Sequence, residues 1–193
     1  MRWQRSKDGS GPETLKRRNA LLGVGLAIVV AVALAVWALA DDNGSDESSE
    51  PAAATEPEIV SVKALRASAA AHATPVYWVG ASAGTKLELS RPSPEQTYVR
   101  YLTGDAEAGD SRKFLTVGSY TYADPAAALR ARGSEPGGVN ATAPGGGVVY
   151  FDQADPKSVY LAYPGIEVEI EVFAPEFKEA LQLVTDGRVV PIE

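Results

Sequence analysis

The chain has 193 residues, a formal net charge of −7, one histidine and no cysteine. An acidic chain of this kind is a poor partner for nucleic acid, because phosphate binding requires clustered Lys and Arg. Without cysteine the chain has no disulfide and no acylated-cysteine anchor. The single histidine, His72, has no second histidine or thiol with which to hold zinc. We therefore expect no nucleic-acid partner, no metal and no cofactor.

Residues 20–40 form an uninterrupted apolar segment with the sequence ALLGVGLAIVVAVALAVWALA. As a helix with a rise of about 1.5 Å per residue it would span about 31 Å, which matches a hydrocarbon core about 30 Å thick. Trp37 lies near its end, where an indole ring favours the headgroup boundary. The segment predicts one transmembrane helix that contacts membrane lipid.

The charges on either side of this segment predict its orientation. Residues 1–19 carry six Lys and Arg against two acidic residues, whereas residues 41–58 carry seven acidic residues and no basic one. Because Lys and Arg near a span stay on the cytoplasmic side, we expect a basic cytoplasmic tail and an extracytoplasmic C-terminal domain. The alternative is a signal peptide cleaved after Ala40, which ends an A-x-A-like site; the length of the apolar run favours a retained anchor. Both interpretations export residues 41–193.

Residues 41–58, DDNGSDESSEPAAATEPE, are acidic, rich in Ser, Pro and Ala, and without a large apolar side chain. Such a segment cannot bury enough surface to offset the entropy of the chain. We therefore expect a disordered linker here, followed by one folded domain over residues 59–193. A calcium loop is not expected in the linker, because its glycine does not stand where an EF-hand requires one.

The folded domain combines short segments of period-two alternation with three capped helical segments. The predicted strands are residues 76–80, 86–90, 97–102, 114–120, 148–152, 158–163, 166–173 and 189–190. The predicted helices are residues 61–71, 125–133 and 175–187. Residues 135–147 are rich in glycine and predict a loop. This order predicts an α+β fold, an antiparallel sheet of about seven to eight short strands with three helices packed mainly on one face.

The predicted strand 166–173, IEVEIEVF, alternates strictly between apolar and acidic residues. The alternation predicts a buried face that begins at Ile166 and a solvated face with Glu167, Glu169 and Glu171. Neighbours on one face of a strand lie nearly 7 Å apart, and the solvated side of an antiparallel sheet has this pattern. We therefore interpret the three carboxylates as surface charges rather than as metal ligands or an acid–base pair.

Five segments of the domain form a recognisable set. They are PVYWVG (75–80), YVRYL (98–102), FLTVGSY (114–120), KSVYLAYPG (157–165) and GRVVPI (187–192). Together they resemble an uncharacterised family of actinobacterial single-pass membrane-anchored proteins, over about residues 60–192. The resemblance implies a basic tail, one span and an exported domain. It implies no activity and assigns no role to any residue.

The leading functional hypothesis is a binding or structural module of the bacterial cell envelope, with an envelope polymer or a membrane protein as its partner. It is motivated by an anchor, a linker and a small domain in which no catalytic set of residues is recognised. Aromatic side chains on the strands can hold a glycan or a peptide, because tyrosine and tryptophan combine an apolar body with a polar tip. Trp78 and Tyr101 are the first candidates for ligand binding.

Two alternatives accompany this hypothesis. One is an envelope hydrolase that uses a pair of carboxylates. Its candidate residues are Asp152, Asp155, Glu167 and Glu169. Nothing in their spacing selects them over other acids, and no G-x-S-x-G elbow accompanies His72, so no catalytic residue is assigned. The other is an accessory subunit that contacts a membrane protein through the span, where Gly23 and Ala27 form a small-xxx-small pair.

Overall fold

The structure, a computed structural model, describes residues 55–193. The predicted cytoplasmic tail, the predicted span at residues 20–40 and most of the predicted linker lie outside the described residues. Within residues 55–193, no helix combines the length and the apolar character that crossing a bilayer requires.

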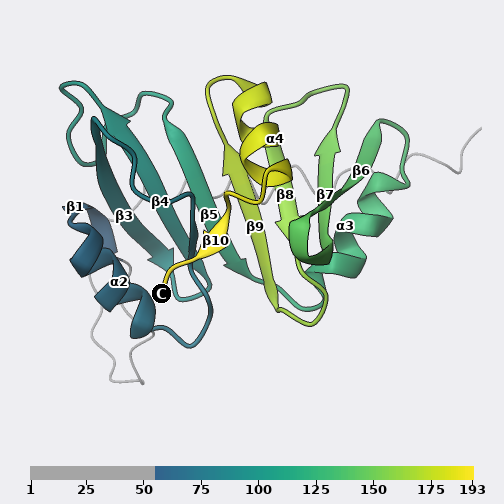
Figure 1. Ribbon diagram of the computed structural model, residues 1–193, viewed down its shortest axis with the longest axis horizontal. Coiled ribbons are helices and arrows are strands. Elements are labelled where there is room, and N and C mark those ends of the chain that lie inside the picture. Colours follow the sequence, from purple (N-terminus) through teal and green to yellow (C-terminus); the bar gives the residue numbers. More distant parts are fainter. Residues whose placement is uncertain (1–54) are drawn as a thin grey trace, which may run out of the picture. The chain divides into compact units, whose positions relative to one another are not determined.

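Eight strands form one antiparallel sheet, and two short strands form a second. Across the large sheet the order is β1 (Thr55–Val60), β3 (Thr85–Ser93), β4 (Gln96–Thr103), β5 (Leu115–Thr121), β9 (Val168–Phe173), β8 (Ser158–Ala162), β7 (Gly147–Asp152) and β6 (Gly138–Ala143) (Figure 1). The small sheet pairs β2 (Tyr77–Trp78) with β10 (Val190–Pro191). The helices are α2 (Val62–Ala70), α3 (Pro125–Gly133) and α4 (Phe177–Thr185), and a 3-10 turn, η2 (Pro144–Gly146), joins β6 to β7.

The predicted α+β class and antiparallel sheet are confirmed, but the helices divide between the two faces of the sheet. Leu65 of α2 and Val184 of α4 belong to the same buried cluster as Leu161 of β8. Leu129 of α3 packs instead with Ala162, the next residue of β8. Because successive strand residues point to opposite faces, α3 lies on the face opposite α2 and α4. We call the side of α2 and α4 the core face, and the side of α3 the open face.

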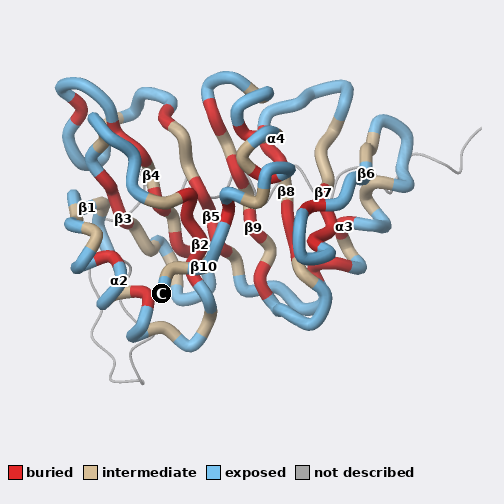
Figure 2. Tube along the Cα trace, viewed as in Figure 1, coloured by how far each residue is buried: buried red, intermediate tan, exposed pale blue. Residues whose placement is uncertain are grey.

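The main core lies between the core face and the layer formed by α2, α4 and the β2–β10 pair (Figure 2). α2 and α3 begin where the sequence predicts, whereas α4 begins at Phe177, two residues after the predicted Pro175, and has no side-chain cap. Ser61 caps α2 by accepting a hydrogen bond from the Ala64 backbone N–H at 3.1 Å. Asp124 caps α3 by accepting one from Ala127. Local capping thus fixes where both helices start, and apolar burial fixes which face each one covers.

Two edge strands were not predicted. β1 starts at Thr55, so residues 55–58, expected in the linker, lie in the sheet, where Glu58 pairs with Leu89 and Val60 with Leu87. β6 lies in the segment expected to be a glycine-rich loop. Neither strand has more than one buried residue, so backbone pairing rather than an apolar pattern holds them. Such strands give almost no period-two signal.

Candidate functional site

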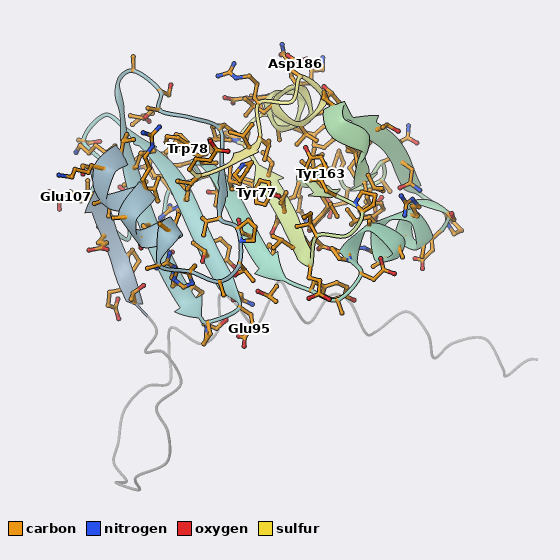
Figure 3. All side chains as sticks on the ribbon, turned by 60° about the horizontal axis from the view of Figure 1, so that its bottom comes forward. Tyr77, Trp78, Glu95, Glu107, Tyr163 and Asp186 are labelled. Atoms are coloured by element: carbon orange, nitrogen blue, oxygen red, sulfur yellow. The ribbon has the colours of Figure 1, made fainter. Side chains whose placement is uncertain are left out.

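Trp78 and Tyr101, the predicted ligand-binding residues, both lie in the main core. Trp78 is 7% exposed and Tyr101 is 2% exposed. Trp78, which is labelled in Figure 3, pairs with Val190 of β10 in the small sheet. The Tyr101 hydroxyl accepts a hydrogen bond from the Val79 backbone N–H at 2.9 Å, which ties β4 to the end of β2. Packing accounts for both side chains, and a ligand-binding role for them stays a prediction.

We expect Tyr101→Phe to lower the free energy of unfolding by about 1–2 kcal/mol, because the Val79 amide would lose its acceptor inside the core. Burial raises the pKa of Tyr101 to about 12, whereas tyrosine in an unfolded chain ionises near pH 10. The stability contributed by this group is therefore complete below about pH 10 and is lost as the pH rises toward that higher pKa. Urea denaturation across this pH range measures both effects. Wild-type stability of Tyr101→Phe at neutral pH would contradict the assigned hydrogen bond.

Three of the four carboxylates proposed for a hydrolase are either engaged by another group or exposed to solvent. Asp152 closes a turn by accepting the Ala154 backbone N–H at 2.8 Å. Asp155 forms a surface ion pair with Lys157 at 2.6 Å, and Glu167 is exposed. Among residues 55–193, no group of three or more His, Cys, Asp and Glu side chains is placed to hold a metal ion. The fourth carboxylate, Glu169, belongs to a different arrangement on the open face.

One line of aligned positions crosses the open face. Strand register pairs Tyr98 of β4 with Gly118 of β5, and Gly118 with Glu171 of β9. It then pairs Glu171 with Tyr160 of β8, and Tyr160 with Tyr150 of β7. Neighbouring strands are about 4.8 Å apart, so the line runs about 19 Å from Tyr98 to Tyr150. We call its side chains the tyrosine row: Tyr98, Tyr120, Tyr150, Tyr160 and Glu171.

Tyr120 joins the row because Gly118 leaves space for it. Its ring folds back along β5 until a Cβ placed on Gly118 would lie 2.9 Å from the Tyr120 hydroxyl oxygen. In this position the hydroxyl donates a hydrogen bond to Oε2 of Glu171 at 2.5 Å. The ring also meets Tyr98 edge to face, with centroids 5.7 Å apart. A larger residue at position 118 would push this phenol out of the row.

Glu171 is the acceptor at the centre of the row. Besides the bond from Tyr120, the Tyr160 hydroxyl lies 3.5 Å from its Oε1 atom. Burial, followed by the negative charge of Glu171, raises the pKa of both Tyr120 and Tyr160. Both phenols therefore stay protonated at neutral pH. They act as hydrogen-bond donors rather than as nucleophiles or bases.

Arg132 of α3 covers the other end of the row. Its guanidinium carbon lies 5.1 Å from the ring centroids of both Tyr150 and Tyr160. The same guanidinium forms an ion pair with Glu169 of β9. Burial raises the pKa of Glu169, and the positive charge of Arg132 opposes that shift. The ion pair with Glu169 neutralises the charge of Arg132 and fixes α3 against the row.

These contacts correct the predicted solvated face of β9. Glu169 and Glu171 are half-buried rather than solvated, because Arg132 and two tyrosines lie against them. Ile166, predicted to begin the buried face, is 37% exposed and precedes the strand. Only Glu167 stands in solvent as expected. The difference arises because β9 lies in the middle of the sheet, where tyrosines of β5 and β8 flank its carboxylates.

The half of the open face formed by β3, β4 and β5 carries no helix in the described part of the chain. α3 packs on β6, β7, β8 and β9, with its apolar contacts at Val148 and Ala162. α2 and α4 lie on the core face. Tyr98 is therefore reached from outside without passing a helix, and it is only half-buried.

A buried ion pair shapes the loop beside this half of the face. Glu88 of β3 is 1% exposed and lies 2.6 Å from Nη1 of Arg100 on β4. It also accepts the Gly109 backbone N–H at 2.6 Å. Arg100 donates in turn to the Asp110 carbonyl at 2.7 Å. Phe114 packs under this loop, with the Arg100 guanidinium carbon 5.5 Å from its centroid. The pair thus ties the β4–β5 loop to the sheet at Gly109 and Asp110.

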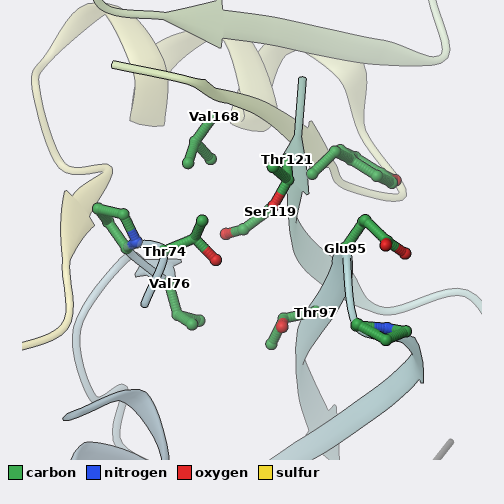
Figure 4. A pocket seen from close by; sticks show the side chains of 10 residues that line it. Thr74, Val76, Glu95, Thr97, Ser119, Thr121 and Val168 are labelled. Carbon is green, nitrogen blue, oxygen red and sulfur yellow. The ribbon is translucent and has the colours of Figure 1, made fainter. Parts of the chain in front are cut away.

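Two shallow surface hollows are also present, one of which has Tyr120 of the tyrosine row in its lining. In one, Thr74, Thr97 and Ser119 line a depression that is too narrow for a water-sized sphere (Figure 4). The other has a volume of about 270 Å³ and lies between β1 and β3, next to Ile59. Each has a single charged residue in its lining, Glu95 in the first and Lys86 in the second. Neither brings an acid and a base together.

No family model, curated protein or solved structure matches the chain. The resemblance to the actinobacterial membrane-anchored family therefore stays a prediction. The candidate site rests on the geometry of the open face alone.

Proposed function

We propose that the protein is a membrane-anchored binding module of the bacterial cell envelope and that it holds an envelope polymer on the tyrosine row. The apolar segment at residues 20–40 and the charges beside it support an anchor with the C-terminal domain outside the cytoplasm. The observation that carries the binding role is the tyrosine row itself. It aligns four phenols and a carboxylate over five neighbouring strands.

The chemistry of the row supports binding over hydrolysis. A general base needs a pKa near the working pH and a free lone pair. Tyr120 and Tyr160 keep their protons, and Glu169 is engaged by Arg132. Glu171 already accepts a hydrogen bond from Tyr120. These groups offer fixed donors, acceptors and ring surfaces, which is what recognition of a polymer requires.

The test is co-sedimentation of the full chain with purified cell-wall sacculi. The chain is reconstituted in phosphatidylcholine nanodiscs, because detergents with sugar headgroups would compete for the site. We expect the wild type to sediment with the sacculi and Tyr98→Ala to bind about tenfold more weakly, a loss of about 1.4 kcal/mol. Tyr122→Ala is the matched control, because Tyr122 is 51% exposed and lies outside the row. Absence of wild-type binding, or equal loss in both variants, would refute the proposal.

The orientation has a separate test. Protease added to intact cells should digest the domain while leaving the anchored N-terminal part in the membrane. Digestion only after permeabilisation would place the domain in the cytoplasm and reverse the proposed layout. A membrane or secreted form lacking the first forty residues would replace the anchor with a cleaved signal peptide.

A further inference from the structure

We propose that the ligand of the tyrosine row is an uncharged polysaccharide chain that lies across the strands from Tyr98 to Arg132. This inference rests on the proposed binding function and adds the chemical class of the ligand. Three properties of the row lead to it: its length, its mixture of ring surfaces with hydrogen-bonding groups, and its charge balance.

The row is long and linear. It extends about 19 Å from β4 to β7. Arg132 covers the Tyr150 and Tyr160 end, and the remaining stretch of about 10 Å from Tyr98 to Glu171 exceeds the size of one sugar ring. At one end Tyr98 and Tyr120 present phenol rings at 84° to each other. An aromatic ring is a suitable surface for the apolar C–H face of a sugar, while the phenol hydroxyl reaches its polar rim.

The polar groups of the row suit a ligand with many hydroxyls. Glu171 in the middle has about four lone-pair positions, of which Tyr120 fills one at 2.5 Å and Tyr160 a second at 3.5 Å. Arg132 covers the Tyr150 and Tyr160 rings, so at that end the ligand meets guanidinium N–H donors. A sugar hydroxyl donates a hydrogen bond to the Glu171 carboxylate and accepts one from the Arg132 guanidinium. An acyl chain would instead remove water from Glu171 without replacing its hydrogen bonds.

The charge balance disfavours an anionic polymer. The described residues contain twelve Lys and Arg against eighteen Asp and Glu, a net charge of −6. On the row itself, the one guanidinium, Arg132, is already paired with Glu169, which leaves the charge of Glu171 unbalanced. A phosphate-rich or uronic-acid polymer would therefore be repelled. An extended peptide is a poorer fit, because peptides add to the edges of sheets, where backbone groups are free, rather than to their faces.

The experiment keeps the co-sedimentation assay and adds soluble competitors. We expect an uncharged oligosaccharide of β-1,4-linked N-acetylglucosamine to weaken binding of the chain to the sacculi at least tenfold. Stem peptides released from the sacculi by an amidase, added at the same concentration, should not compete. Binding should change less than twofold when the salt concentration is raised, because an uncharged ligand offers no ionic attraction to screen. Tyr98→Phe should bind within twofold of the wild type, whereas Tyr98→Ala should bind about tenfold more weakly.

Each contrary result identifies a different failure. If wild-type protein binds sacculi but the stem peptides compete and the oligosaccharide does not, the ligand is a peptide and the inference is wrong while the binding function stands. If added salt abolishes binding, the ligand is an ionic polymer. The inference is then wrong, while the binding function stands. If the chain forms a dimer that Tyr98→Ala disrupts, the row is an interface between copies. If no sacculi bind at all, the proposed function itself fails.

Discussion

Glu88→Ala is expected to lower the free energy of unfolding by about 3 kcal/mol. Removing one partner of a buried ion pair leaves the other charge uncompensated, at a cost of about 3–5 kcal/mol. We expect the lower end of this range, because a fifth of the Arg100 side chain reaches solvent. The variant also removes the acceptor of the Gly109 backbone N–H. Urea denaturation of the wild type and the variant measures the difference.

The matched control for this prediction is Glu95→Ala. Glu95 is also a carboxylate near the β3–β4 hairpin, but it is exposed. Its removal should change stability by less than about 0.5 kcal/mol. A Glu88→Ala variant as stable as Glu95→Ala would show that the Glu88–Arg100 pair does not organise the β4–β5 loop.

Leu161→Ala is expected to lower the free energy of unfolding by about 3 kcal/mol and to leave polymer binding unchanged. Leu161 is fully buried in the main core, and truncation of such a leucine costs about 2–5 kcal/mol through lost burial and a cavity. Its neighbour Tyr160 points to the other face of the same strand and belongs to the row. The two positions therefore separate stability from binding within one strand.

The measurement compares Leu161→Ala with Tyr160→Ala by denaturation and by co-sedimentation with sacculi, at a temperature where both remain folded. Tyr160→Ala should weaken binding about tenfold, a loss of about 1.4 kcal/mol. If Leu161→Ala weakened binding as much as Tyr160→Ala, the loss would reflect a general loosening of the domain. The tyrosine row would then have no specific role.

The alternation of β9 shows how far the sequence predicts this domain. Val168, Ile170 and Val172 are buried in the main core, as the period-two pattern requires. The same pattern placed Glu169 and Glu171 in water, which is wrong. Their surroundings come from β8, the strand just before β9, and from β5 and α3, which are farther away in the sequence. Alternation predicts which residues share a face, but not which strands lie beside them.

The tyrosines of β4 show the same limit. Tyr98 and Tyr101 are three positions apart on one strand, so the sequence alone places them on opposite faces. It does not tell which of the two faces α2, α4 and the β2–β10 pair will cover. Tyr101 was favoured as a ligand site, and it is the one that lies in the core. The sequence also does not predict a place for Arg132 in the site, because nothing in its own helix indicates that it will lie over Tyr150.

The claim that the tyrosine row is the binding surface is tested most directly by photo-crosslinking. Benzoylphenylalanine is introduced in place of Tyr98, Tyr122 or Ile59, one position at a time, in the full chain in phosphatidylcholine nanodiscs mixed with sacculi. Position 98 lies in the row, position 122 outside it, and position 59 beside the hollow between β1 and β3. We expect irradiation to attach the chain to the polymer only from position 98. Attachment from position 59 or 122, with none from 98, would contradict a binding surface on the open face.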